Sequence, residues 1–262
     1  MFNFRQLLML FSLIILNHGQ ASASDIAKEK RWAEQISDSL LDGESISLKA
    51  GKQEFMAIFT ESANTSNERA IILLHGLGVH PDWPAVIHPL RVGLPEHNWS
   101  TLSIQLPVLA NGVDIHEYGP LFKQAAPRIQ AATEYLQSQG SRSIVLVSHS
   151  LGAAMASWYI ATQKNTQIKG LVTIGLSDLE LPPDINILNS IEKIQLPLFD
   201  LYGSRDLDSV LHSAAARKKA AIKSANKDYQ QKRITGADHF FNNYDDALVR
   251  TVYGWLKRYF KP

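Results

Sequence analysis

The stretch that decides the fold of this chain is Ser143–Ala154, with the sequence SIVLVSHSLGAA. An apolar, β-branched run leads to Ser150, which has the small residues Ser148 and Gly152 two positions away on either side. We expect a strand that turns sharply into a helix, because small residues at these two positions let the strand and helix backbones approach each other. Ser150 would then lie at the apex of the turn, beside the N–H groups of the helix start. The pattern predicts a nucleophile elbow, with Ser148 at a position that is usually glycine.

Apolar runs with turn residues on both sides surround this stretch. We expect strands over 70–74, 99–106, 144–147, 170–176, 197–202 and 229–234. We expect helices over 82–97, 115–139 with an interruption at Pro127, 151–163, 210–223 and 244–260. Such an alternation predicts an α/β fold with a mostly parallel central sheet and helices on both faces. Before it, the pattern predicts a helix within 24–42 and two strands within 44–60 around a turn at 50–52. Segment 177–196 is too short for a sizeable cap domain, so we expect an open site.

The N-terminus has the features of a secretory signal peptide. Arg5 precedes an apolar run over 7–16, and Ala21-Ser22-Ala23 fits a cleavage site for small residues. We therefore expect a signal peptide over 1–23 and a single domain over 24–262, with an uncleaved anchor as the alternative. The apolar run is short for a membrane span, so no stable span is expected after cleavage.

Composition narrows the possible functions. The chain has 262 residues, 45% of them hydrophobic, and a formal charge of +1 that becomes 0 once Arg5 is removed. A neutral chain without a basic block gives no reason to expect nucleic-acid binding. The absence of cysteine excludes disulfides, thiolate metal sites and a cysteine nucleophile. An exported chain without disulfides suits a bacterial periplasm, with secretion to the medium as the alternative.

Two further residues follow Ser150 in the order that a catalytic triad on this kind of sheet requires. A serine hydroxyl needs a base to accept its proton, and the base needs an acid to orient it. Asp206 lies just after the predicted strand 197–202, and His239 lies between the last strand and the last helix. Ligands bind at the carboxyl ends of parallel strands, where all three residues are expected. Asp208 and Asp178 remain alternative acids.

An oxyanion site would need two backbone N–H donors. We expect one from Leu151 at the helix start and one from Leu77 in the loop His75-Gly76-Leu77-Gly78. His75 is expected to bond the backbone of that loop. His149 is expected to point away from Ser150 and to pack or support the site.

Other polar and aromatic residues have two possible roles. The segment His80–Trp83 could form a wall of the cleft or pack on the edge of the sheet, and the same two roles are open for Phe240 and Phe241. The basic residues of 217–223 are expected on a solvated helix face. No histidine spacing suggests a metal site.

Together, the motifs around His75–Gly78, Ser148–Gly152, Gly203–Asp206 and Asp238-His239 resemble those of the α/β-hydrolase superfamily over about residues 55–260. The segments His80–Pro84, Pro89–Arg91 and Trp99–Pro107 are similar to a bacterial family of exported α/β-hydrolase-like proteins of unknown function. The resemblance implies the α/β-hydrolase fold and a hydrolase activity, and it implies no substrate.

These observations predict a serine hydrolase that cleaves an ester or related acyl bond of a small molecule through an acyl-enzyme. No cofactor or metal is expected, and the oligomeric state is left open. Acyl transfer to another acceptor would use the same triad. A non-catalytic binding or envelope-assembly protein with this fold is the alternative from another functional class.

Overall fold

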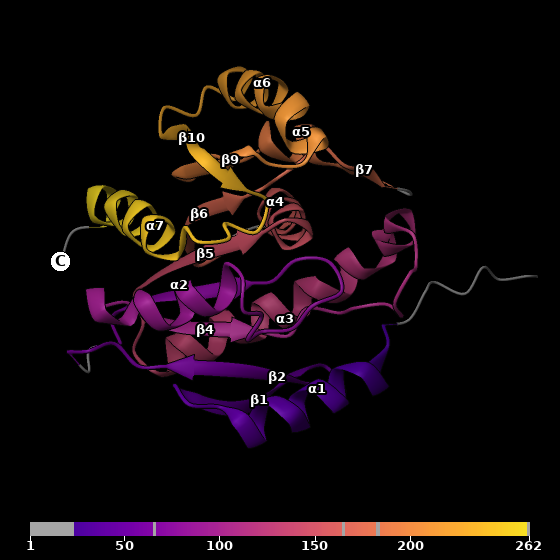
Figure 1. Cartoon of the computed structure of the whole chain (residues 1–262), viewed down its shortest axis with the longest axis vertical. Coiled ribbons are helices and arrows are strands. Elements are labelled where there is room, and N and C mark those ends of the chain that lie inside the picture. The colour runs from indigo at the N-terminus through magenta and orange to yellow at the C-terminus, as the bar shows by residue number, and fades with distance from the viewer. Residues whose placement is uncertain (1–23, 65–66, 164–165, 182–183, 261–262) are drawn as a thin grey trace, which may run out of the picture.

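The computed structural model of the chain describes residues 24–64, 67–163, 166–181 and 184–260. These residues form an eight-stranded sheet with helices packed on both of its faces (Figure 1). The expected signal peptide over 1–23 and its cleavage site lie outside the described residues. Within the described part, no helix is both long and apolar enough to cross a membrane.

The main sheet is parallel except at one strand. Its strands in chain order are β1 (Glu44–Ala50), β2 (Gln53–Thr60), β3 (Arg69–Leu74), β4 (Ser100–Ile104), β5 (Ser143–His149), β6 (Ile168–Ile174), β9 (Leu198–Arg205) and β10 (Tyr229–Asp238). Across the sheet they run β1-β2-β4-β3-β5-β6-β9-β10, and β2 is antiparallel to both of its neighbours. The mostly parallel sheet and the β1–β2 hairpin are therefore confirmed.

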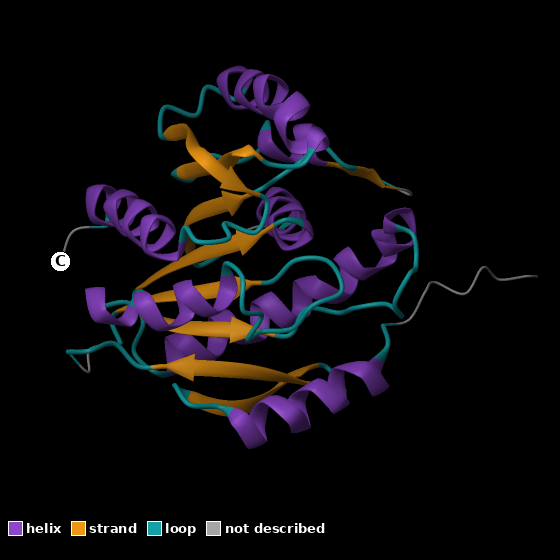
Figure 2. Cartoon of the chain, in the orientation of Figure 1, coloured by secondary structure: helices purple, strands orange, loops and turns teal. Residues whose placement is uncertain are grey.

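Seven α-helices of the described residues cover the sheet (Figure 2). They are α1 (Ile26–Ser39), α2 (Ile87–Gly93), α3 (Gly119–Ser138), α4 (Leu151–Thr162), α5 (Ile187–Ile191), α6 (Asp208–Lys223) and α7 (Asp245–Tyr259). Helices α3 to α6 pack in a row against one face, where they bury the larger apolar core. Helices α2 and α7 cover the other face, and α1 extends that layer over β2. Because both faces of the sheet are covered, the central strands are continuous apolar runs in the sequence.

The segment between β6 and β9 is small, as expected. It contains the two-stranded hairpin of β7 (Glu180–Leu181) and β8 (Ile185–Asn186), followed by α5. Helix α5 packs against α4 and α6 and so belongs to the layer over the sheet. The described residues therefore include no sizeable cap domain.

Two helix predictions are wrong in their extent. Helix α2 begins only at Ile87, because Val86 has φ of 65°, which a right-handed helix does not accommodate. Helix α3 continues through Pro127, which removes the hydrogen bond to the carbonyl of Lys123. Lys123 and Pro127 are both exposed, so water can form a hydrogen bond with the carbonyl of Lys123 and the helix is not broken.

The prediction of a solvated basic face on α6 is wrong for Arg217. This side chain is completely buried, and its guanidinium donates to both carboxylate oxygens of Asp200 at 2.9 and 3.3 Å. Tyr229 and Gln231 also donate to Asp200. Arg217 lies on the side of α6 that faces the sheet, and a buried charge is tolerated there because it is fully paired. Lys218 and Lys219 are exposed as predicted.

Candidate active site

Ser150 forms the turn between β5 and α4 and has a strained backbone. Its φ of 53° and ψ of −122° lie outside the regions that residues other than glycine normally adopt. The surroundings hold this conformation in place. The N–H of Ser150 donates to the carbonyl of Ile174 on β6 at 2.8 Å, and its carbonyl accepts from the N–H groups of Ala153 and Ala154. Strain that is held by neighbouring structure is common at functional sites, and here it presents the hydroxyl at the sheet edge.

The two small neighbours have separate reasons to be small. A Cβ on Gly152 would lie 2.3 Å from the carbonyl oxygen of His75 and 2.7 Å from that of Leu74. The helix start and the end of β3 are thus in direct backbone contact, as expected for an elbow. Ser148 is buried, and its hydroxyl donates to the carbonyl of Val172 on β6 at 2.9 Å. A serine is accommodated at the usual glycine position because its hydroxyl has this partner.

The structure brings Ser150, His239 and Asp206 into one hydrogen-bonded chain. His239 Nε2 lies 3.0 Å from Ser150 Oγ, and His239 Nδ1 lies 2.6 Å from Asp206 Oδ1. Ser150 follows β5, Asp206 follows β9 and His239 follows β10, so all three lie at the carboxyl ends of their strands. The two alternative acids, Asp208 and Asp178, are exposed and form no contact with His239.

Asp206 is held as a carboxylate. Burial by itself would raise its pKa, but hydrogen bonds and charge attraction from His239 and the N–H groups of Gly203 and Leu207 lower the pKa below its usual value. These N–H groups donate at 3.1 and 2.9 Å. A carboxylate only accepts hydrogen bonds, so Nδ1 of a neutral His239 carries the proton and Nε2 is free to accept one. This is the arrangement in which an imidazole can deprotonate Ser150.

The expected oxyanion donors lie beside Ser150. A Cβ on Gly76 would be 3.2 Å from Ser150 Cβ, so the loop with Leu77 lies against Ser150. Leu151 is the first residue of α4. Among the described residues, the N–H groups of Leu77 and Leu151 have no hydrogen-bond acceptor. Both N–H groups are therefore available to a ligand beside Ser150.

His75 holds the loop before Leu77, as expected. Its Nδ1 lies 2.9 Å from the carbonyl oxygen of Gly76, and its Nε2 accepts from the N–H of Leu106 at 2.9 Å. Burial lowers the pKa of His75 to about 3, so the ring is neutral near pH 7. A neutral ring can donate at Nδ1 and accept at Nε2 at the same time, which ties the loop after β3 to the loop after β4.

His149 supports the proposed base, a role for which the only sequence signal was its position next to Ser150. Its Nε2 donates to the backbone carbonyl of His239 at 2.9 Å, and the two rings are 4.8 Å apart. Burial, followed by repulsion from His239, lowers the pKa of His149 to about 4. A neutral His149 therefore anchors the backbone of His239 from the strand that carries the nucleophile.

The aromatic residues near the site divide between the core and the surface. Phe241 is completely buried in the core under α2 and α7, whereas Phe240 is 44% exposed. The ring of His80 lies between those of Trp32 and Trp83, at 5.4 and 5.5 Å. These ring contacts favour packing of the segment His80–Trp83 against α1 over its alternative role as a wall of the cleft.

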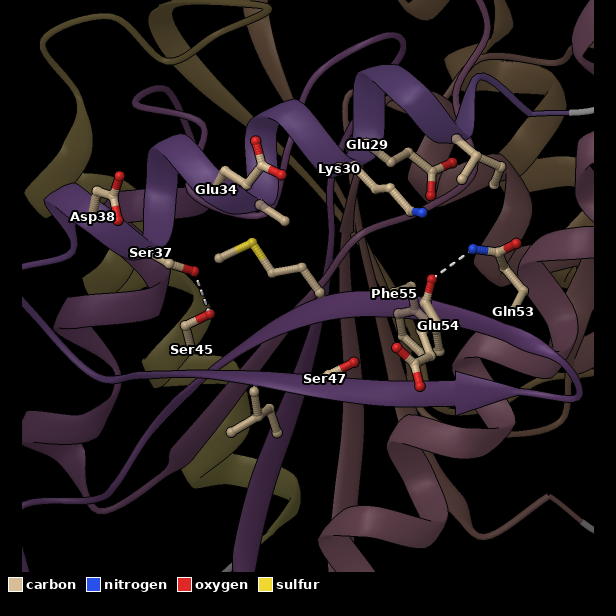
Figure 3. Close-up of a pocket in the computed structure, with 14 residues that line it drawn as sticks. Glu29, Lys30, Glu34, Ser37, Asp38, Ser45, Ser47, Gln53, Glu54 and Phe55 are labelled. Carbon is tan, nitrogen blue, oxygen red and sulfur yellow. Dashed lines mark hydrogen bonds between the residues drawn. The ribbon is translucent and has the colours of Figure 1, made fainter.

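A large groove of the molecule lies away from these residues. It has a volume of about 740 Å³ and runs between α1 and the β1–β2 hairpin (Figure 3). Its lining does not include Ser150, Asp206 or His239. Two of its polar side chains, those of Ser37 and Ser45, form a hydrogen bond with each other at 2.8 Å. The described residues also contain no group of three or more His, Asp or Glu side chains that could hold a metal. This groove and the hydrogen-bonded residues Ser150, His239 and Asp206 are therefore at separate places on the molecule.

Comparison with known families and structures agrees with the fold. A family model with the description "Protein of unknown function (DUF3530)" matches residues 19–117 and 121–258. No protein with a curated description matches the chain. Among solved structures, the chain is similar to Est1E from Butyrivibrio proteoclasticus, with 14% identity and a TM-score of 0.66 over 84% of this chain and 100% of that one.

Two other similar structures are an esterase and a dienelactone hydrolase. An esterase of Pyrococcus furiosus, Pf2001, has 18% identity and a TM-score of 0.67 over 86% of this chain and 94% of that one. A dienelactone hydrolase from Anabaena variabilis has 16% identity and a TM-score of 0.66 over 83% of this chain and 98% of that one. At these identities the likeness shows the fold, and it confirms the α/β-hydrolase fold expected from the sequence.

Proposed function

The chain belongs to the DUF3530 family of proteins of unknown function, and from the geometry of its site we propose that it is a serine hydrolase of esters or related acyl compounds. The observation that carries the proposal is the chain of two hydrogen bonds, at 3.0 and 2.6 Å, that joins the strained Ser150 to His239 and Asp206. A serine packed only for structural reasons needs neither a strained backbone nor a buried imidazole–carboxylate pair. The esterases and the dienelactone hydrolase among the similar structures support the reaction class.

The first half of the reaction forms an acyl-enzyme. Ser150 Oγ attacks the carbonyl carbon of the substrate while its proton passes to His239 Nε2. The N–H groups of Leu77 and Leu151 stabilise the negative oxygen of the tetrahedral intermediate. When the intermediate collapses, the bond from carbon to the leaving oxygen breaks, and the proton on Nε2 goes to the departing alcohol.

The second half releases the acid. A water molecule gives a proton to His239 Nε2 and attacks the acyl carbon, and the bond to Ser150 Oγ breaks as the proton returns to that oxygen. Asp206 stabilises the positive imidazolium in both halves and remains ionised throughout. If an alcohol or amine replaces the water, the same steps give acyl transfer.

The proposal is tested by labelling with a fluorophosphonate and by hydrolysis of p-nitrophenyl butyrate. Ser150→Ala should abolish labelling and reduce kcat by about 10⁴-fold or more, because the nucleophile is lost. Ser148→Ala is the matched control, since this serine lies two residues away with its hydroxyl bonded to Val172, and it should keep labelling. Esterase activity that persists in Ser150→Ala would refute the assignment. Absence of labelling in the intact protein would favour the non-catalytic alternative.

The acid is tested in the same way. Asp206→Asn should reduce kcat by about 10⁴-fold, because an amide favours the wrong tautomer of His239. Asp208→Asn, two residues further on, should retain the activity of the intact protein. Equal loss in both variants would show that Asp206 has no special role. Product analysis with added methanol distinguishes acyl transfer from hydrolysis.

A further inference from the structure

Large apolar side chains are exposed around the proposed site. Among the described residues, Leu77 is 41% exposed, Leu207 is 51% exposed and Phe240 is 44% exposed. They come from three different loops, after β3, β9 and β10, and each loop also contributes a proposed donor, acid or base. Scattered exposed apolar residues need no explanation, but several around one site indicate a binding surface.

Phe240 is held on the surface by the structure of its loop. The side chain of Asp238 accepts hydrogen bonds from the N–H groups of Phe240 and Asn242 at 3.0 and 3.1 Å. The next residue, Phe241, has φ of 55° and is completely buried. The turn thus sends one phenylalanine into the core and the other outward, where its ring lies 5.2 Å from the ring of His239.

Leu77 and Leu207 are exposed on the two other loops that surround the site. Leu77 follows Gly76, and a Cβ on Gly76 would lie 3.2 Å from Ser150 Cβ. Leu77 is therefore the neighbour in sequence of a residue that packs against Ser150. The N–H of Leu207 donates to Asp206 Oδ1, the same oxygen that bonds His239. An acyl group bonded to Ser150 would therefore lie beside loops that each expose an apolar side chain.

The charged groups of these loops disfavour an anionic acyl group. Asp206 and Asp208, the first residue of α6, flank Leu207, and Asp238, the last residue of β10, lies two residues before Phe240. Arg205, at the end of β9, donates through Nε to the carbonyl of Gly236 at 2.8 Å. A substrate carboxylate would approach more negative than positive charge, which is unfavourable.

We infer that the substrate of this site is a neutral ester with an apolar acyl group, which lies on the surface formed by Leu77, Leu207 and Phe240. The inference rests on the proposed function and adds the substrate class to it. An open surface covers about one side of an acyl chain, so each added methylene should raise kcat/KM about twofold, against about fourfold for full burial.

The test compares p-nitrophenyl esters at concentrations where they are monomeric. For the intact protein, kcat/KM should rise about tenfold or more from acetate to hexanoate. A p-nitrophenyl ester of a dicarboxylic acid with one free carboxylate should be hydrolysed more slowly than the neutral ester of the same length. In Phe240→Ala and in Leu207→Ala the ratio of hexanoate to acetate should fall by about twofold to fourfold. Ile222→Ala, an exposed apolar residue on α6, is the matched control and should keep the ratio.

The two proposals fail in different ways. If a fluorophosphonate labels Ser150 and esters are hydrolysed, but chain length has no effect or Phe240→Ala keeps the ratio, the inference about the substrate is overturned and the hydrolase assignment stands. Faster hydrolysis of the carboxylate-bearing ester would also overturn it. If the intact protein is neither labelled nor active on any of the esters, the proposed function fails and the inference fails with it.

Discussion

Replacing Gly152 by alanine should impair the site without changing any of its functional groups. The added Cβ would lie 2.3 Å from the carbonyl oxygen of His75 and 2.7 Å from that of Leu74, and neither backbone atom can rotate away. An ordinary contact at this position starts at 3.4 Å, so the start of α4 and the end of β3 must separate by about 1 Å. Leu151 and the loop before Leu77 lie on the two sides of this contact, so the separation moves the two expected oxyanion donors apart.

The expected size of the effect follows from this shift. A misplacement of about 1 Å at a catalytic site reduces the rate by about 100-fold. The loss should appear in kcat, with KM nearly unchanged, because the donors act on the negative oxygen of the transition state. Overpacking at this contact should also cost about 1–3 kcal/mol of the free energy of unfolding.

The assay measures kcat and KM for p-nitrophenyl butyrate together with urea unfolding. Gly254→Ala is the matched control, because Gly254 lies within α7 and a Cβ there meets no atom within 4 Å. This control should leave kcat unchanged and raise the free energy of unfolding by up to about 1 kcal/mol. If Gly152→Ala retains both the kcat and the stability of the intact protein, the elbow contact does not constrain the site and the reasoning is refuted.

Three other predictions concern stability and maturation. Arg217→Met should lower the free energy of unfolding by about 3–5 kcal/mol in urea unfolding, because the buried Asp200 loses its cation, and a loss below 1 kcal/mol would contradict this. Burial lowers the pKa of His75 to about 3 and of His149 to about 4, against the ordinary 6.5, so the unfolded chain binds protons below pH 6.5 that the folded chain does not. Stability should therefore fall as pH falls from 6.5 towards 4, by about 2 kcal/mol per histidine at pH 5, and an equal urea midpoint at pH 7 and pH 5 would exclude it. We propose that residues 1–23 are a signal peptide that is removed, so N-terminal sequencing of the protein from bacterial cells should begin at Ser24, whereas retention of residues 1–23 would support an anchor.

Much of the fold could be predicted because its elements are locally encoded. The apolar runs that became β3, β5 and β6 are buried on both faces, so hydrophobicity alone marked them. The predictions that were wrong depend on surroundings. Pro127 does not interrupt α3, because solvent reaches the carbonyl it leaves unpaired, and Arg217 is buried because Asp200 lies opposite it.

The candidate site divides in the same way. The turn at Ser150 could be predicted because small residues at fixed spacing are a local requirement of the backbone. The sequence predicts that His149 packs or supports the site, but it does not identify the carbonyl of His239 as the acceptor, because that residue lies 90 positions further along the chain. The direction of Phe240 and Phe241 depends on a single positive φ, which two identical side chains in sequence do not reveal.

The sequence by itself determined the order along the chain of the main-sheet strands and of the helices other than α5, the turn at Ser150, and the order of the serine, acid and histidine candidates. It did so because strand pattern, turn shape and chain order are properties of neighbouring residues. Only the tertiary structure decided that Asp206, and neither Asp208 nor Asp178, reaches His239, at 2.6 Å. That choice depends on the positions at which β9 and β10 end beside each other, which is set by the packing of the whole sheet.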